Sequence, residues 1–310
     1  MSSSARWVLS GGAVAAVIVV VVSGIAAATT IGPGTLGHSA PGALAKPKVK
    51  ELCAVPEDNA AGLYPASKTS AYVENYSDGN LSVCGAGTDR TVAAPPSGFA
   101  GTGYDGLAGL KISGELDLLL ISWAIDSGWY CLGASTAGCA STAGFSLPST
   151  FCAAQPIGTC HPNGLVLSKS KGFTYVDSGN AEMVTCTADA ASCVVDAATN
   201  YFSGFEPVGI AQNGSTLYVS DLSCTGWVWS GSASSMSRVK SIGDSLEGIT
   251  VHDGSLYVGD NGACTDSKGH VVDVSTGAAL PTLLKSSDQY IGLDSALQFD
   301  SYDTGGVYSV

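Results

Sequence analysis

Acidic side chains recur at one place in a repeated phrase of the sequence. The runs "LYVSD" (217–221) and "LYVGD" (256–260) end in Asp221 and Asp260, and "TYVD" (174–177) ends in Asp177. Three clustered carboxylates would bind a cation or exchange protons. Because each one follows the same apolar run, the recurrence instead favours a structural role, in which the carboxylate caps the turn after a strand. The stretches 77–80 and 259–266 resemble calcium loops but lack the full ligand spacing.

Cysteine and histidine offer little other chemistry. The ten cysteines are an even number, which in an exported chain favours disulfides over free thiols. A zinc site is disfavoured because no CxxC pair exists and His161 is the only histidine near a cysteine. The histidines at 38, 161, 252 and 270 are isolated, so no Ser/His/Asp arrangement stands out.

The composition is typical of an all-β protein. Apolar residues make up 45% of the 310 positions and charged residues only 13%, and the 40 glycines predict many turns between short strands. The formal net charge of −13 argues against a nucleic-acid partner, since phosphate binding needs clustered Lys and Arg.

The amino-terminal segment predicts export. Residues 7–31 are uncharged and apolar, so residues 1–31 are expected to form one hydrophobic helix. That helix is either a single-pass transmembrane signal-anchor or a signal peptide, with a small-residue site at 26–28. Residues 32–50 are a Gly/Pro-rich linker, and 51–310 form the folded domain. Three sequons, at Asn75, Asn80 and Asn213, make the secreted or membrane-bound product a candidate glycoprotein.

A two-part phrase recurs along the folded domain. A small residue followed by an aliphatic residue precedes a strand-like run such as "LYV", and the phrase starts at 62, 109, 164, 209, 248 and 296. A strand-like repeat of roughly 40–50 residues is typical of a β-propeller. The sequence therefore predicts six blades, with the Gly-aliphatic segment innermost and the "LYV" run second. Residues 226–231 and 237–242 would be outer strands of one blade.

Closure of the ring is a separate question. The sixth copy ends at residue 310 after two strands, so the last blade is either incomplete or completed from the other terminus. The run "KELCAV" at 50–55 lies just before the first copy, and we expect it to supply an outer strand to the last blade.

The propeller frame suggests five disulfides. Cys84, Cys131 and Cys186 fall at a common third-strand position, which places two short bridges in outer hairpins and one in a long insertion. Cys224 and Cys264 occupy matching places in adjacent blades. The predicted pairs are Cys53–Cys84, Cys131–Cys139, Cys152–Cys160, Cys186–Cys193 and Cys224–Cys264.

The phrases "PVGIAQNGSTLYVSD" (207–221) and "LEGITVHDGSLYVGDN" (246–261) resemble NHL-type propeller repeats. The phrase "NGLVLSKSKGFTYVDS" (163–178) resembles the six-bladed senescence-marker-protein/gluconolactonase group. The resemblance covers about residues 60–310 and implies an axial divalent cation, Ca²⁺ or another, held by polar residues at the starts of inner strands. The matching candidates are Asn163 and Glu247, with Asp294 able to contribute.

Three functions remain open from the sequence. The first is a cell-surface or extracellular recognition module that binds a protein or glycan on one face of the disc. The second, implied by the resemblance, is a metal-dependent hydrolase of the lactonase or esterase type, in which the cation polarises a carbonyl and activates water. The third is a structural subunit of a surface assembly. The propeller superfold hosts all of these, so fold alone does not choose.

Overall fold

The structure is a computed structural model. It describes residues 49–54, 60–85, 87, 89–101, 103–122, 124–147, 161–168, 170, 172–196, 202, 204–264, 269–280, 293–300 and 306–310, apart from the side chains of 104, 105 and 112. The chain divides into two compact units, Met1–Leu44 and Ala45–Val310. The predicted helix at 1–31, and the linker except for its last two residues, lie outside the described residues. No described helix is long and apolar enough to span a bilayer.

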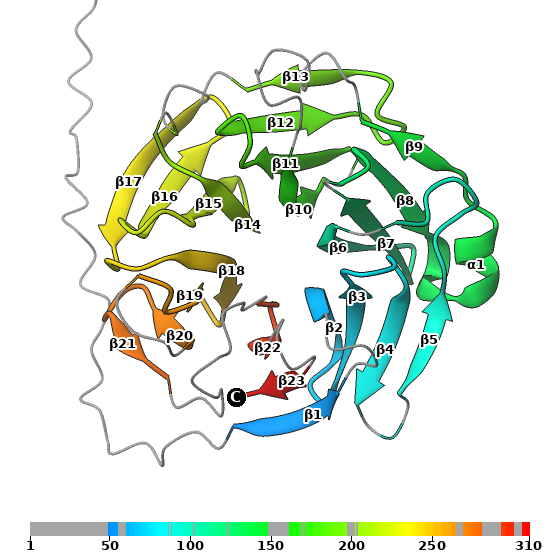
Figure 1. Cartoon of the computed structure of the whole chain (residues 1–310), viewed down its shortest axis with the longest axis horizontal. Helices are drawn as coiled ribbons and strands as arrows, with labels where there is room; N and C mark the ends of the chain where they lie inside the picture. Colours follow the sequence, from blue (N-terminus) through cyan, green and yellow to red (C-terminus); the bar gives the residue numbers. More distant parts are fainter. Residues whose placement is uncertain are drawn as a thin grey trace, which may run out of the picture. The chain divides into compact units, whose positions relative to one another are not determined.

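The second unit is a six-bladed β-propeller (Figure 1). Within the described residues, five sheets have four strands each, ordered from the innermost strand outward. Blade 1 comprises β2 (Ala60–Ser67), β3 (Ser70–Asn75), β4 (Leu81–Gly85) and β5 (Arg90–Ala93). Blade 2 comprises β6 (Tyr104–Ile112), β7 (Glu115–Ser122), β8 (Ser127–Cys131) and β9 (Gly144–Ser146).

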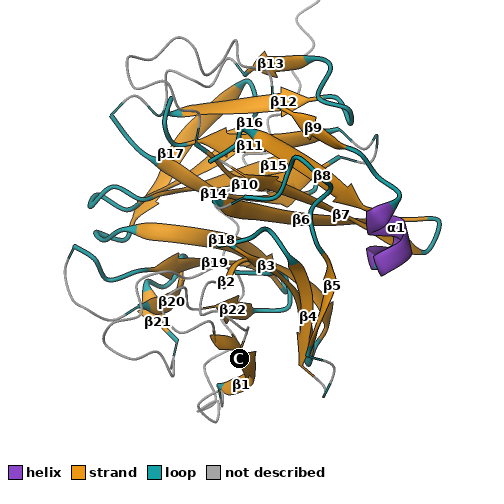
Figure 2. Ribbon diagram, turned by 45° about the vertical axis from the view of Figure 1, so that its right-hand side comes forward, coloured by secondary structure: helices purple, strands orange, loops and turns teal. Residues whose placement is uncertain are grey.

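The next three blades repeat this plan. Blade 3 comprises β10 (Pro162–Leu167), β11 (Phe173–Asp177), β12 (Glu182–Cys186) and β13 (Cys193–Val195). Blade 4 comprises β14 (Pro207–Asn213), β15 (Thr216–Asp221), β16 (Trp227–Ser232) and β17 (Ser235–Ser241). Blade 5 comprises β18 (Leu246–His252), β19 (Ser255–Asp260), β20 (His270–Asp273) and β21 (Ala278–Ala279). The described helical segments, η1 (Leu132–Ala134) and α1 (Thr136–Ala140), lie in the β8–β9 connection (Figure 2).

Blade 6 is closed by the amino-terminal strand, as the sequence predicts. Its sheet has the order β1 (Lys50–Ala54), β23 (Gly306–Ser309) and β22 (Gln298–Asp300), and an isolated bridge joins Leu293 to Phe299 on the inner side. The sixth phrase is nevertheless displaced from its predicted place. Tyr308 lies on the third strand rather than the second, and the innermost segment is at Leu293 rather than at 296–297.

Each pair of neighbouring blades encloses its own hydrophobic core, which gives six clusters around the ring. The alternation of a strand supplies two of these cores at once. On β7, Leu118 and Leu120 pack toward blade 1, whereas Leu119 and Ile121 pack toward blade 3. All four side chains are fully buried, which at about 2 kcal/mol each makes the second strands a major source of stability.

Candidate functional site

An axial ring of six aliphatic residues stands at one level of the central channel. Each blade contributes one residue from its innermost segment: Leu63, Leu107, Leu165, Ile210, Ile249 and Leu293. Two cavities, of about 80 Å³ and about 270 Å³, are each lined by all six residues. The smaller, which we name the upper cavity, is lined otherwise by residues that precede the ring in sequence. The larger, the lower cavity, is lined otherwise by residues that follow it.

Glycine precedes the ring residue because the next blade leaves no room for a side chain. A Cβ added to Gly62 would lie 2.8 Å from the Cβ of Leu107, and one added to Gly164 would lie 3.0 Å from the Cα of Gly209. Both distances are too short for ordinary packing. The Gly-aliphatic phrase therefore marks the inner strands, as predicted.

Two copies of that phrase were placed too late in the sequence, by three residues in blade 2 and by four residues in blade 6. In blade 2 the ring residue is Leu107, preceded by Gly106, rather than Leu110 after Gly109. The misleading Gly109 has a separate packing role, because a Cβ there would lie 2.5 Å from the ring of Tyr64. In blade 6 the ring residue is Leu293, which Gly292 precedes in the sequence.

The three predicted metal ligands do not line one cavity. Glu247 lines the upper cavity and Asp294 the lower one, while Asn163 immediately precedes the axial glycine of blade 3. All three are buried, at 5%, 4% and 7% exposure for Glu247, Asp294 and Asn163. Within the described residues, no group of three or more His, Cys, Asp and Glu side chains could hold a metal ion.

Hydrogen bonds hold both candidates of the upper level. The Nδ2 of Asn261 donates to Oε1 of Glu247 at 3.0 Å. The Nδ2 of Asn163 donates to Oγ of Ser178 at 2.8 Å, so the amide oxygen of Asn163 is not the group used in that contact.

The corrected register adds a residue that the sequence reading missed. Asp105 directly precedes Gly106 on β6, so it takes the place in blade 2 that Asn163 takes in blade 3 and Glu247 in blade 5. The signal was present as "DGL" at 105–107 and would have been found with the phrase aligned on Gly106.

The repeated aspartates have the structural role that their recurrence predicts. Oδ1 of Asp177 accepts from the backbone N–H of His161 at 3.0 Å and of Asn180 at 3.1 Å. Oδ1 of Asp221 likewise accepts from the N–H of Glu206 at 2.9 Å and of Ser223 at 3.0 Å. Each carboxylate thus joins the turn after its own second strand to the start of its inner strand, as an Asx-type cap does.

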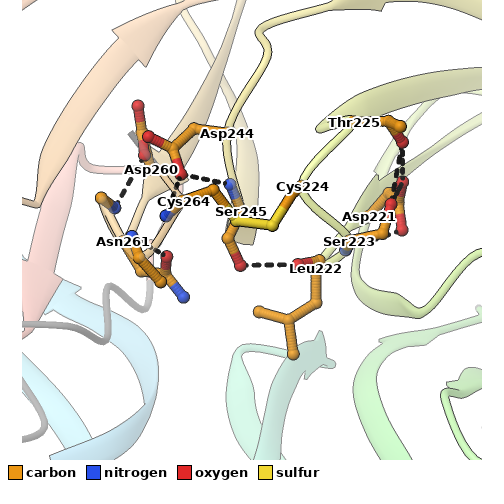
Figure 3. The surroundings of a disulfide bond; sticks show 12 residues. Asp221, Leu222, Ser223, Cys224, Thr225, Asp244, Ser245, Asp260, Asn261 and Cys264 are labelled. Atoms are coloured by element: carbon orange, nitrogen blue, oxygen red, sulfur yellow. Dashed lines mark hydrogen bonds between the residues drawn. A yellow bond between two sulfur atoms is a disulfide. The ribbon is translucent and has the colours of Figure 1, made fainter. Parts of the chain in front are cut away.

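A disulfide joins blades 4 and 5 where their second strands end (Figure 3). Cys224 and Cys264 are 5.5 Å apart at Cα. Beside the bridge, Oδ1 of Asp244 accepts from the N–H of Cys264 at 2.9 Å, and Oγ of Ser245 donates to the carbonyl of Leu222 at 2.6 Å. The contacts between these two blades therefore combine a covalent bond with polar contacts and an aliphatic core.

Three more of the suggested pairs are bonded in the structure. Cys53–Cys84 joins the closing strand β1 to the third strand of blade 1, and Cys186–Cys193 spans the outer hairpin of blade 3. Cys131–Cys139 joins β8 to helix α1 rather than to the fourth strand, so it closes a loop instead of clamping a hairpin. Cys152 and Cys160 lie outside the described residues.

We name as face A the side of the disc where second strands end and inner strands begin. Its described connections, from the second to the third strand and from the fourth strand to the next blade, contain no Lys or Arg. They contain five acidic residues and one histidine: Asp78, Asp126, Asp196, Glu206, Asp244 and His161. The hairpins of the opposite side, face B, are flanked by both signs of charge, including Lys68, Arg90 and Lys111.

Several carboxyl groups on face A have raised pKa values, so they become protonated at a higher pH than usual. Burial, together with the charge of Asp177, raises the pKa of Asp126 to about 6, while His161 opposes the rise. Burial and the charge of Asp221 raise the pKa of Glu206, again opposed by His161. His161 therefore lies within electrostatic reach of both acids, although it is isolated in the sequence.

The remaining predicted residues are spread over the disc. Among the sequons, Asn213 is exposed, Asn80 is half-buried, and Asn75 is buried and accepts from the N–H of Ser77 at 2.8 Å. Glycosylation stays a prediction, with Asn213 the most accessible acceptor. Trp129 and Trp229 are buried in blade-to-blade cores.

Comparisons with known proteins show the fold without showing a family. No family model and no curated protein matches the chain. Virginiamycin B lyase from Staphylococcus aureus superposes with a TM-score of 0.55 at 13% identity, over 84% of this chain and 98% of that chain. A streptogramin B lyase gives 0.53 at 9% identity, over 84% and 96%. A chain of a nidogen/laminin complex gives 0.50 at 12% identity, over 72% and 78%. At such identities the likeness is to the six-bladed propeller alone.

Proposed function

We propose that the protein is an exported, disulfide-stabilised propeller that binds a basic protein segment through face A. Export rests on the apolar segment at 1–31, acting as signal peptide or anchor, and on disulfides, which persist in oxidising compartments. A role in protein binding has a precedent in the fold, since the neighbour named above comes from a nidogen/laminin complex.

The observation that carries the proposal is the one-sided charge of the described connections on face A. Connections whose described residues include acidic groups and no Lys or Arg attract a Lys/Arg-rich segment and repel an acidic one. Turn caps such as Asp177 keep the backbone of these connections in place, so the acidic side chains are displayed on a fixed framework.

The test is binding of a Lys/Arg-rich peptide and of its acidic counterpart to the full chain at low and moderate salt. The variant Asp78→Asn/Asp126→Asn/Glu206→Gln should weaken binding of the basic peptide at least tenfold. The matched control Glu51→Gln/Glu115→Gln/Asp253→Asn removes the same number of exposed charges away from these connections and should leave binding within twofold. Equal losses in both variants would mean that only the overall charge matters, which contradicts a site on face A.

A second function, a metal-dependent hydrolase, is favoured by one observation. Asp105, Asn163 and Glu247 occupy the same position, directly before the axial glycine, in blades 2, 3 and 5. The amide of Asn163 and the carboxylate of Glu247, completed by water, would suit a hard divalent cation that polarises an ester or lactone carbonyl, and Asp105 shares their place in the repeated phrase.

Metal analysis separates the two functions. A bound divalent cation in the purified chain, lost in Asn163→Ala and Glu247→Ala, together with a calcium-dependent rise in Tm, would support the hydrolase. Peptide binding that is unchanged after chelation, with no metal present, would support the recognition module alone.

A further inference from the structure

The outermost strand of blade 4, β17, lies at the rim of the disc and is unusually long (Figure 1). It has seven residues, whereas the outermost described strands of the other five blades have two to five. β17 pairs with β16 on its inner side, and no other described strand pairs with it. Its outer side therefore presents backbone N–H and C=O groups to which an extended segment could add.

The side chains along β17 leave this edge accessible. Five of the seven are exposed: Ser235, Ser237, Arg238, Val239 and Ser241. Val239, at 54% exposure, is the extra residue of a bulge, because the register with β16 shifts between Arg238 and Lys240. A bulge discourages pairing at an edge, but residues 235–238 precede it and pair with 229–232 without a shift. A regular stretch of edge is therefore available before the bulge.

Arg238 is held in place on one face of this stretch. Its guanidinium carbon lies 4.5 Å from the ring centre of Phe205 and 5.0 Å from those of Trp227 and Trp229. Stacking on aromatic rings fixes the guanidinium plane and leaves its N–H donors available. Within the part of the chain that the structure describes, Arg238 has no hydrogen bond and no carboxylate partner. The strand thus carries a positioned cation with unused donors in a chain whose net charge is −13.

The position of Arg238 selects the chemistry of an added strand. In an antiparallel pair, residues directly opposite each other project from the same face, with Cβ atoms about 4.5–5.5 Å apart. An Asp or Glu opposite Arg238 would therefore meet the guanidinium, which can bind both carboxylate oxygens. Lys240 adds a second positive charge, and its Nζ donates to the carbonyl of Ser275 in blade 5 at 3.2 Å. β17 itself contains no acidic residue.

We propose that β17 docks an extended acidic segment of a partner protein, which adds to blade 4 as a fifth strand and places a carboxylate against Arg238. A second copy of this chain fits less well, because two β17 strands side by side would bring the Arg238 and Lys240 charges of both copies together. A basic segment would be repelled by the same two residues. The site lies on the rim rather than on face A, so it does not depend on the function proposed above.

The test is calorimetric titration of the full chain with a ten-residue peptide of alternating Glu and Thr, compared with the same peptide carrying Gln in place of Glu. The salt concentration is about 0.15 M, where charges farther away than about 8 Å are largely screened. The Glu peptide should bind at least tenfold more tightly than the Gln peptide. In Arg238→Gln that preference should fall below threefold. Arg238→Lys keeps the charge without the planar fork and should retain only part of it.

A matched variant tests whether the loss belongs to β17. Arg90 is an exposed arginine on the outermost strand of blade 1, β5, which has four residues. Arg90→Gln removes the same charge and should change the affinity for the Glu peptide less than twofold. Hydrogen exchange of the complex should slow at the amides of residues 235–241.

The peptide backbone supplies the second control. Methylation of alternate backbone nitrogens removes the donors on one side of the peptide without changing its charge, and one of the two possible methylation patterns should abolish binding. Equal losses in Arg238→Gln and Arg90→Gln, or binding that survives both methylation patterns, would overturn the proposal. So would slower exchange in β17 that appears without peptide as the concentration of the chain rises, because the occupant would then be a second copy.

Discussion

The two cavities on the axis share the same six ring residues yet differ in how they treat a buried carboxylate. On the upper side, Glu247 receives a side-chain hydrogen bond from Asn261. On the lower side, Asp294 receives two backbone hydrogen bonds at Oδ1, whereas its Oδ2 has no partner among the described residues. Burial accordingly raises the pKa of Asp294 to about 7. Glu247 is thus supported by a side chain of its own blade, whereas Asp294 is held by the backbone of a tight turn.

Truncating a side chain of the axial ring should have the largest effect on stability, because that side chain lines both cavities. Leu165→Ala would delete a buried side chain that lines both cavities and belongs to the core between blades 2 and 3. We expect a loss of about 3 kcal/mol in the free energy of unfolding, measured by urea denaturation. Leu167→Ala, on the same strand but lining only the lower cavity and half-buried, should cost about half as much. Equal costs would mean that the ring level has no special place in the packing.

The pH dependence of stability should follow Asp294. Its folded-state pKa of about 7 lies above its ordinary value of 3.8, so the folded chain holds this proton more tightly than the unfolded chain. Its contribution is complete below the ordinary value and is lost as pH rises toward 7. We expect Asp294→Asn to remove about 4 kcal/mol of that loss between pH 4 and 8, measured by thermal unfolding at each pH. Four other carboxyls with raised pKa values leave a smaller slope of the same sign in the variant: Asp126, Glu182, Asp196 and Glu206. A profile unchanged by the substitution would contradict the burial of an unpaired acid.

Two residues show how much of the fold and of the candidate site could be predicted from the sequence. Leu165 was found because "NGL" and "TYV" appear together in blade 3, and the propeller, its closure by 50–55 and the capping aspartates followed from that pattern. Asp105 was missed because blade 2 contains two Gly-Leu pairs three residues apart. Only the packing of Tyr64 against Gly109 explains the second pair, and that contact joins different blades, so no local pattern could reveal it.

The predicted register of the sixth blade was wrong for a related reason. Its second strand carries Phe299 where other copies have tyrosine, valine or leucine, while a "VY" pair appears on the third strand. Strand pairing rather than residue type decides which segment is innermost, and the pairing of Leu293 with Phe299 depends on a sheet completed by β1 from the far end of the chain. Asp294 was therefore assigned to the axial metal, although the register places it beyond the ring.

Removing the hydrogen-bond donor to Glu247 should have a moderate effect on stability. Asn261→Ala removes the donor to Glu247 and should destabilise the chain by about 1 kcal/mol, as seen in urea unfolding. Asn261→Ser, which keeps a hydroxyl donor, is the matched control and should recover part of the loss. A variant as stable as the wild type would show that Glu247 does not need this partner.

The smallest effect should come from Asp126 on face A, which offers a test of binding rather than of stability. Asp126 has φ of 44°, a conformation that Asn tolerates, so Asp126→Asn should change stability by only a few tenths of a kcal/mol. Burial and Asp177 keep its pKa near 6, against the opposing effect of His161. As pH rises from 5 to 7 the carboxyl ionises, and binding of a basic peptide to the wild type should tighten. In Asp126→Asn this tightening should be smaller. Since Asp294 lies beyond the ring, Asp294→Asn should leave this peptide binding unchanged while altering the pH profile of unfolding. A change in peptide affinity in Asp294→Asn would mean that the two sides of the axial ring are coupled and do not act independently.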